Sequence, residues 1–211
     1  MIIAVDGPTA SGKGTIAKGL ALHFGLPHLD TGLLYRAVGR QVQLNGGDPD
    51  QPADALAATG FAESLLADPE LRSEETGGLA SRVSIHPAVR EALYERQRRF
   101  AMQPGGAVLD GRDIGTVIAP EAEVKLFVTA SVVARARRRY LEMRDLGRAV
   151  TQAEIEDDLR RRDRRDTTRA TAPLTAAAGA VIIDTSSLDR HEAFAIALAA
   201  VEEALGRSPP A

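Results

Sequence analysis

A glycine-rich loop that follows an apolar run and precedes a helical pattern constrains this chain more than any other feature. The loop follows the run 2–5 and comprises Gly7, Pro8, Thr9, Ala10, Ser11, Gly12, Lys13, Gly14 and Thr15. Glycines let such a loop turn its N–H groups toward an anion, and the N-terminus of the following helix adds the positive end of its dipole. The sequence therefore predicts a triphosphate-binding loop in which Lys13 reaches the β- and γ-phosphates.

The residue after the lysine departs from the common form of this loop. That form has Ser or Thr there as a ligand of Mg²⁺, whereas this chain has Gly14 followed by Thr15. Our candidates for holding Mg²⁺, through water, are Thr15 and Asp110, which ends the apolar run 107–109. A structural cap is an equal alternative for Asp110. The loop by itself also serves GTPases, motor ATPases and small-molecule kinases, so it establishes a nucleotide site and no more.

Short apolar runs that alternate with helical patterns indicate an α/β fold. The runs lack two-residue alternation, which is typical of strands buried on both faces, and they cover 2–5, 107–109, 124–128 and 180–183. A fifth run, at 28–29, is too short to assign alone. Helices are predicted to begin at or just after Lys13, Pro87, Ser131 and the capping box Thr151–Glu154. A last helix is predicted to carry the apolar stripe Phe194, Leu198, Val201 and Leu205. Residues 36–86 are expected to hold helices and loops.

Composition excludes several classes of protein. The chain has no cysteine, which rules out disulfides and thiolate metal sites, and it has no apolar run long enough to cross a membrane. Its 26 basic residues, against 29 acidic ones, are all arginine except Lys13, Lys18 and Lys125. This imbalance reflects either genome composition or phosphate binding by guanidinium groups. Residues 135–169 hold twelve of the arginines, but with eight acids and Tyr140 as the one aromatic residue a nucleic-acid surface is disfavoured.

Further motifs resemble those of the bacterial cytidylate kinases, a family of nucleoside monophosphate kinases. These motifs are Gly14-Thr15 after the lysine, Asp-Thr-Gly-Leu-Leu-Tyr-Arg at 30–36, Ser81 with Arg90 nine residues later, Asp-Gly-Arg-Asp-Ile-Gly-Thr at 110–116, and the arginine-rich segment 162–174. They cover almost the whole chain in order, and together they are highly specific.

The resemblance implies one P-loop kinase domain over 1–211, with three layers around a central parallel five-stranded sheet. The implied core comprises 1–35, 103–134 and 172–206. A helical monophosphate-binding insertion would cover about 36–102 and a lid about 135–171. Relatives often carry a β-hairpin in the insertion, whereas the segment 61–72 is short and helical here. The tail 207–211 is expected to be disordered.

The implied reaction moves the γ-phosphoryl group of ATP to CMP or dCMP, with Mg²⁺ as cofactor. The expected partners are these nucleotides, with no nucleic acid and no membrane, and the expected state is a cytoplasmic monomer. By the resemblance, Arg36, Arg112 and Arg169 hold the acceptor phosphate, and Arg162 and Asp166 contact its ribose. The remaining assignments are CMP contacts at Thr31, Ser81, Arg90 and Asp113, ATP contacts at Arg135 and Arg138, and a catalytic lid contact at Arg165.

Chemistry supports several of these assignments. Planar guanidinium groups bind a phosphate dianion bidentately, as a lysine cannot. Cytosine has a 4-amino donor that a carboxylate such as Asp113 can accept, while Ser81 and Arg90 can donate to its N3 and O2. Uracil has a carbonyl at that position, and the resulting unpaired polar group costs about 1–3 kcal/mol.

Alternatives remain for individual residues and for the function. Arg36 could be a solvated arginine on a helix, and Asp113 could pair with Arg112 or another neighbour. The other helical arginines are expected to be solvated or paired with Glu142, Asp157 and Asp158, and the four histidines to be structural or at the surface. Rival functions are a kinase for UMP, AMP or shikimate, a nucleic-acid-binding protein, and a slowly hydrolysing nucleotide switch.

Overall fold

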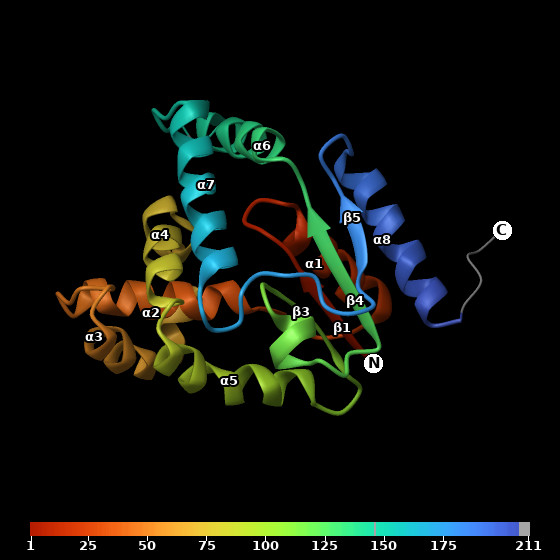
Figure 1. Cartoon of the computed structure of the whole chain (residues 1–211), viewed down its shortest axis with the longest axis horizontal. Helices are drawn as coiled ribbons and strands as arrows, with labels where there is room; N and C mark the ends of the chain where they lie inside the picture. The colour runs from red at the N-terminus through yellow and green to blue at the C-terminus, as the bar shows by residue number, and fades with distance from the viewer. Residues whose placement is uncertain (146, 207–211) are drawn as a thin grey trace.

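Five short parallel strands form the centre of the molecule, which the computed structural model describes for residues 1–145 and 147–206 (Figure 1). The strands are β1 (Ile2–Asp6), β2 (His28–Asp30), β3 (Ala107–Gly111), β4 (Val124–Thr129) and β5 (Val181–Asp184). They lie in the order β2-β3-β1-β4-β5, and every neighbouring pair is parallel. The predicted α/β class and five-stranded sheet are confirmed, including the strand at 28–30. The predicted disordered tail lies outside the described residues.

The helices begin and end close to where the sequence patterns place them. They are α1 (Lys13–Phe24), α2 (Thr31–Leu44), α3 (Pro52–Ala57), α4 (Glu74–Val83), α5 (Pro87–Ala101), α6 (Val132–Asp145), α7 (Gln152–Thr168) and α8 (Arg190–Ala204). Gly25 ends α1 in the left-handed conformation, at φ 64°, where a residue without Cβ is favoured. The capping box of Thr151 and Glu154 is formed at the start of α7. A second box, Asp189 with Glu192, begins α8 and was missed.

Each face of the sheet is covered by helices, which makes three layers. Ile3 and Val5 of β1 pack with Ile16 and Leu20 of α1, and Val201 of α8 lies in the same cluster. The alternate residues of β1 and β3 face the other way, toward α5 and the single π-helical turn Ile114–Ile118. Both sets of strand side chains are buried, so the strands show no polar alternation in the sequence.

The register of the sheet brings the carboxyl ends of three strands together. Val5 of β1 and Asp30 of β2 both pair with Asp110 of β3. The phosphate loop leaves β1 at this edge, α2 leaves β2, and the turn with Arg112 and Asp113 leaves β3. Ligands of open parallel α/β sheets bind at this edge.

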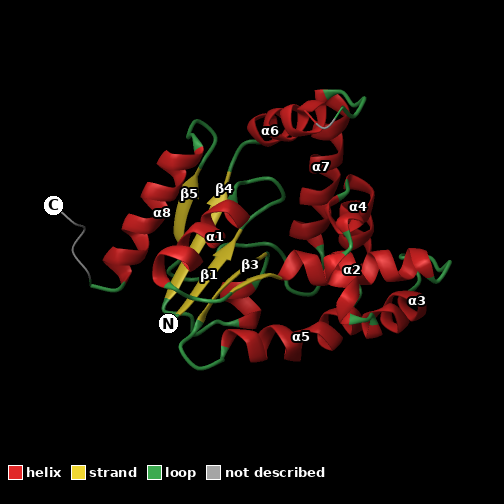
Figure 2. Ribbon diagram, turned by 180° about the vertical axis from the view of Figure 1, so that it is seen from behind, coloured by secondary structure: helices red, strands yellow, loops and turns green. Residues whose placement is uncertain are grey.

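The segment between β2 and β3 builds a helical unit with its own core. Leu34, Val38 and Val42 of α2 pack with Leu71, Val83 and Leu93, and α2–α4 lie beyond the sheet on the side opposite α8 (Figure 2). From 31 to 106 the chain forms helices, turns and loops, which confirms the prediction made for 36–86. The segment 61–72 is helical in short 3-10 turns, Glu63–Ala67 and Pro69–Arg72.

Helices α6 and α7 pack against each other and return the chain to the sheet. Their contact buries Ala136, Met143, Ile155 and Leu159. Helix α7 lies beside α4 of the preceding unit (Figure 1). The assignment of these parts as core, insertion and lid stays a prediction.

Candidate active site

A cleft of about 830 Å³ opens at the carboxyl edge of the sheet. The phosphate loop, the first turn of α2, α4, the turn after β3, the two helices α6 and α7, and the segment after β5 all contribute to its walls. The residues of our sequence assignment that line it are Thr9–Thr15, Thr31, Arg36, Ser81, Arg90, Asp110, Arg112, Asp113, Arg138, Arg162, Asp166 and Arg169.

Backbone geometry shapes the phosphate loop. Gly7 has φ +154°, and a Cβ there would lie 2.0 Å from the carbonyl oxygen of Val128 in β4. Gly12 has φ +92° and forms the N-cap of α1, so both positions require glycine. Gly7 and Pro8 do not line the cleft. Their contribution is to turn the chain from β1 into the loop.

Lys13 reaches from the start of α1 toward the end of β3. Its Nζ lies 3.9 Å from Oδ1 of Asp110, and the other carboxylate oxygen of Asp110 is 2.8 Å from Nε2 of His28. Burial, followed by the charge of Arg112, lowers the pKa of Lys13 to about 8. Burial therefore disfavours the charged form of the lysine, and a phosphate anion bound beside it would favour that form again.

His28 is a contact that sequence reasoning missed. Its strand has three residues, and a lone histidine carries no spacing signal. The parallel register, in which Asp30 pairs with Asp110, places the His28 side chain beside the same carboxylate. His28 thus orients Asp110 and leaves the Oδ1 atom for Lys13.

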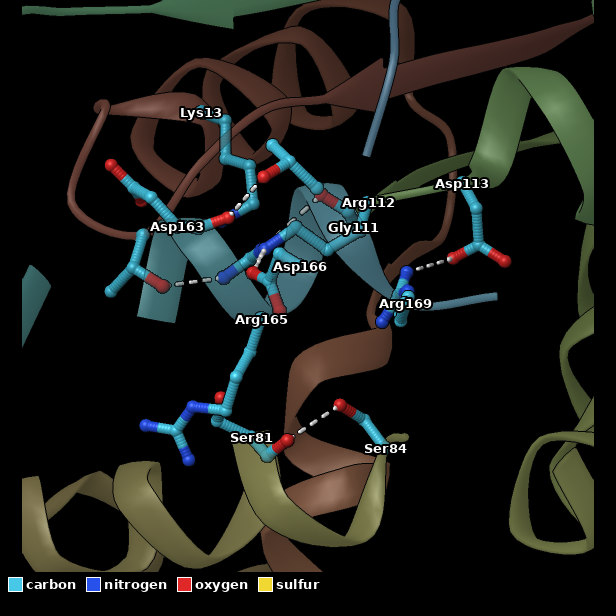
Figure 3. A network of polar contacts seen from close by, with 12 residues as sticks. Lys13, Ser81, Ser84, Gly111, Arg112, Asp113, Asp163, Arg165, Asp166 and Arg169 are labelled. Carbon is cyan, nitrogen blue, oxygen red and sulfur yellow. Dashed lines mark hydrogen bonds and ion pairs between the residues drawn. The ribbon is translucent and has the colours of Figure 1, made fainter. Parts of the chain in front are cut away.

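Arg112 links the phosphate loop to α7. Its Nε donates to Oδ2 of Asp166 at 2.8 Å, and its Nη2 donates to Oγ1 of Thr9 at 2.6 Å (Figure 3). Burial lowers the pKa of Arg112, but the charge of Asp166 and its hydrogen bond outweigh this and the net shift is upward. An arginine between the phosphate loop and α7 is placed to contact an anion bound in the cleft.

Asp113 pairs with Arg90 rather than with Arg112. The Arg90–Asp113 hydrogen bond joins α5 to the turn after β3, and Nη2 of Arg169 lies 3.9 Å from the other carboxylate oxygen. All three side chains are buried. The Arg112 alternative for Asp113 is therefore wrong, and the neighbour that pairs with it is Arg90.

Two buried polar atoms beside this pair lack hydrogen-bond partners within the described part of the chain. They are Oγ of Ser81 and Nη2 of Arg169. A buried polar group without a partner costs free energy, and both residues line the cleft. Their arrangement fits a polar ligand between α4 and the end of α7.

Asp6, at the end of β1, supports the turn after β3. Sequence reasoning missed this contact as well. Its carboxylate accepts hydrogen bonds from the backbone N–H groups of Ile114 and Gly115, both at 2.8 Å. Burial raises its pKa to about 6, against the effect of these two hydrogen bonds. Asp6 ends β1 and so ties the start of the phosphate loop to the segment that follows Asp113.

The guanidinium group of Arg36 bonds to the protein backbone rather than being solvated on a helix surface. Its Nη1 donates to the carbonyl oxygens of Leu71 and Ser73, at 2.7 and 2.8 Å. Burial, followed by the charge of Arg162, lowers the pKa of Arg36 to about 10. The solvated alternative is wrong, and Arg36 and Arg162 face one part of the cleft.

Besides Gly7 and Pro8, two predicted arginine contacts lie outside the cleft lining. Arg135 donates to the carbonyl oxygens of Ala130 and Thr9 and pairs with Asp163, which ties α6 and α7 to the phosphate loop. The Arg165 side chain extends away from Lys13 (Figure 3). In this structure Arg135 holds the phosphate loop against α6 and α7. Its contact with ATP stays a prediction, as does the lid role of Arg165.

Arg138 and Arg139 lie on the cleft side of α6. Arg138 donates to the carbonyl oxygens of Thr185 and Leu188 in the segment after β5. Arg139, expected to be solvated or paired, pairs with Glu142 of its own helix and with Glu74 of α4. The pairing with Glu74 has no signal in the sequence.

Comparison with known proteins assigns the chain. The family model described as cytidylate kinase matches residues 3–203. The chain belongs to the cytidylate kinase family. Among the cytidylate kinases that it resembles, the protein of Methylocella silvestris is 55% identical over 205 residues, which cover 97% of this chain and 95% of the relative. That of Xanthobacter autotrophicus is 55% identical over 202 residues, covering 96% and 97%.

A solved structure of much lower sequence identity has the same fold. The crystal structure of an uncharacterized protein from Eubacterium ventriosum matches with a TM-score of 0.53 and 15% identity, over 94% of this chain and 96% of that one. Membership of the cytidylate kinase family confirms the resemblance on which the assignments above were made. Within residues 1–145 and 147–206, no helix has the length and apolar character that crossing a membrane requires.

Proposed function

We propose that this protein transfers the γ-phosphoryl group of ATP to CMP or dCMP, giving ADP and CDP or dCDP. One observation carries the proposal. The phosphate loop shares a cleft with a cluster made of Ser81 and the buried residues Arg90, Asp113 and Arg169, whose side chains come from separate parts of the chain. This cluster offers a carboxylate acceptor, a hydroxyl and two guanidinium groups, which complement the edge of cytosine and a phosphate.

On the donor side, the loop 7–15 and Lys13 would bind the triphosphate of ATP, with Arg138 at the wall near Thr185. Phosphoryl transfer demands little covalent chemistry of the protein, so positioning and charge stabilisation dominate. Lys13 would neutralise charge on the β- and γ-phosphates as the bond to the leaving group breaks. Arg135 and Arg165 are proposed to approach ATP when the lid closes.

Mg²⁺ would accompany ATP. The described residues contain no group of three or more His, Asp or Glu side chains that could hold a metal by themselves. This fits Mg²⁺, which keeps several waters and takes one or two carboxylates together with phosphate oxygens. We assign Thr15 and Asp110 to it, through water. When bound, the ion would neutralise the charge of the phosphates during the transfer.

On the acceptor side, the guanidinium groups of Arg36, Arg112 and Arg169 would hold the monophosphate in line with the γ-phosphate of ATP. Arg162 and Asp166 would contact the ribose, and Thr31 would border the site from the start of α2. The partner of Arg112 in the empty cleft is Asp166. Binding of the acceptor therefore exchanges ion pairs within the protein for ion pairs with the nucleotide.

Base selection would rest on Ser81, Arg90 and Asp113. Asp113 would accept from the 4-amino group of cytosine, while Ser81 and Arg90 donate to the N3 and O2 side. Because Arg90 already pairs with Asp113, the carboxylate is held in a fixed position. We further propose that the protein acts as a cytoplasmic monomer without a nucleic-acid partner, since one chain supplies the cleft and its arginines are paired with its own acids.

The test is the release of ADP from ATP and Mg²⁺ with CMP, dCMP, UMP, AMP or shikimate offered separately. We expect CMP and dCMP to stimulate ADP release far above the rate without acceptor, with UMP well behind. Equal stimulation by UMP would contradict the base-reading assignment. Failure of both CMP and dCMP to exceed the no-acceptor rate would overturn the proposed function, and a matching rate for shikimate or AMP would redirect it.

A further inference from the structure

One acidic side chain lies among three arginines at the mouth of the cleft. Glu74 begins α4, and its carboxylate pairs with Arg139 of α6 and, at 3.3 Å, with Nη2 of Arg162 of α7. The same Nη2 atom donates to the backbone oxygen of Glu74 at 3.1 Å. Nη1 of Arg36, from α2, donates to the carbonyl oxygen of the preceding Ser73. A single helical turn therefore collects guanidinium groups from three other helices.

Gly77 makes this gathering possible. A Cβ at this position would lie 2.7 Å from Nη1 of Arg162 and 2.8 Å from Nη2 of Arg36. Both guanidinium groups therefore pass directly over α4. Their mutual repulsion contributes to the lowered pKa of Arg36, after burial, and the charge of Glu74 acts in the opposite direction.

Glu74 also joins two parts of the chain that we assign to different subdomains. Arg139 and Arg162 belong to the helices assigned to the lid, while Glu74 and Arg36 belong to the unit assigned to the monophosphate. All four residues line the cleft. The side chain of Glu74 is 34% exposed, so its carboxylate can leave the arginines without crossing a packed core.

We propose that Glu74 is a positioning residue of the acceptor site: without a ligand its carboxylate holds Arg139 and Arg162 beside Arg36. The phosphate that Arg36 binds then replaces the carboxylate as their partner, and Arg162 contacts this phosphate in addition to the ribose. The inference deepens the proposed function and rests on it for the identity of the acceptor. A carboxylate and a phosphate compete for the same guanidinium forks. Glu74 therefore keeps the arginines together without a ligand and lowers the apparent affinity of the site for phosphate.

The direct test is Glu74→Gln, which keeps the shape of the side chain and removes its charge. With the donor site filled by a non-hydrolysable ATP analogue, inorganic phosphate is titrated and its Kd read from the rise in Tm. We expect the Kd to fall by about two- to fivefold, the scale of a partly exposed ion pair. The KM for CMP should fall by a similar factor, while kcat does not rise.

Glu75→Gln is the matched control. Glu75 lies in the same turn of α4 and carries the same charge, but it is exposed, bonds to Gln43 and does not line the cleft. It should leave the Kd for phosphate and the KM for CMP unchanged. An equal effect of both variants would show that net charge alone is responsible, and an unchanged or weaker Kd in Glu74→Gln would overturn the inference.

A distance measurement separates positioning from a purely structural role. The chain has no cysteine, so Leu56→Cys in α3 and Arg144→Cys in α6 give one specific pair of spin labels at exposed sites. In the empty enzyme Glu74→Gln should broaden the label distance toward longer values, and phosphate should restore it. An unaltered distribution would contradict the proposal. The readout needs no turnover, so loss of CMP kinase activity in the unsubstituted protein would defeat the proposed function without deciding this one.

Discussion

The two halves of the cleft are built in different ways. The donor half is a continuous loop whose form is set by the backbone, with Gly7 and Gly12 at positions where a side chain is strained or excluded. The acceptor half is assembled from separate helices, and its arginines are held by acids of the same protein, such as Asp166 and Asp113. On the proposed assignment, the donor loop needs little rearrangement to bind its ligand, whereas the acceptor half would have to exchange ion-pair partners. Substitutions in the two halves should differ accordingly.

The largest expected effect is in the donor half. Lys13→Met should lower kcat/KM by about 10³-fold or more, because it removes charge stabilisation of the transferring phosphoryl group. The Tm should not fall, because the lysine is charged at a cost in the empty cleft, as its pKa of about 8 indicates. Steady-state kinetics and a thermal melt of the same preparation check both outcomes.

Lys125→Met serves as the control for Lys13→Met. Lys125 belongs to β4, and it does not line the cleft. Its replacement should leave kcat/KM within about twofold, as expected for a partly exposed residue away from the site. A comparable loss in both variants would mean that overall charge, rather than the phosphate loop, sets the rate.

In the acceptor half we expect a smaller loss that depends on the substrate. Asp113→Asn keeps the shape of the side chain but offers an amide where cytosine presents its 4-amino donor. kcat/KM for CMP should fall about 10- to 100-fold, the cost of one unpaired buried polar group, and that for UMP should fall much less. The Tm should also fall, since Arg90 loses its charged partner. Equal losses for CMP and UMP would remove Asp113 from base reading.

The difference between the halves also explains what the sequence could predict. The phosphate loop is contiguous, so Lys13 and its strand–loop–helix setting followed from local pattern. Strands such as 107–111 were predicted because both of their faces are buried and their residues are apolar. The three-residue strand at 28–30 was indicated only by the short run at 28–29. These features depend on neighbours in the chain, which a sequence displays directly.

The long-range pairings around the cleft could not be predicted in the same way. Asp6 with the amides of Ile114 and Gly115, His28 with Asp110, and Glu74 with Arg139 join residues far apart in the chain. Each depends on the register of the sheet or on how α4 meets α6. Family resemblance supplied the acceptor residues themselves, but it did not indicate which acid holds which arginine in the empty cleft.

Acidity gives a further way to separate the halves. The pKa of Lys13 in the empty cleft is about 8, lowered first by burial, so the free enzyme loses this charge as the pH rises through 8. kcat/KM for ATP should then fall about tenfold per pH unit above 8. With ATP bound, the phosphates keep the lysine charged, so kcat/KM for CMP at saturating ATP should change little from pH 7 to 9. A flat profile for ATP over that range would contradict this assignment.

The smallest expected effect tests whether a hydroxyl group without a protein partner in the acceptor half binds the ligand. Oγ of Ser81 is buried, and no partner for it exists among the described residues. Ser81→Ala should therefore raise the KM for CMP about three- to tenfold, the value of one hydrogen bond, without lowering the Tm. Ser84→Ala should instead lower the Tm and leave the KM for CMP unchanged, because Oγ of Ser84 donates to the carbonyl oxygen of Ser81 at 3.1 Å. A drop in the Tm of Ser81→Ala with an unchanged KM would show that this hydroxyl serves the fold rather than the nucleotide.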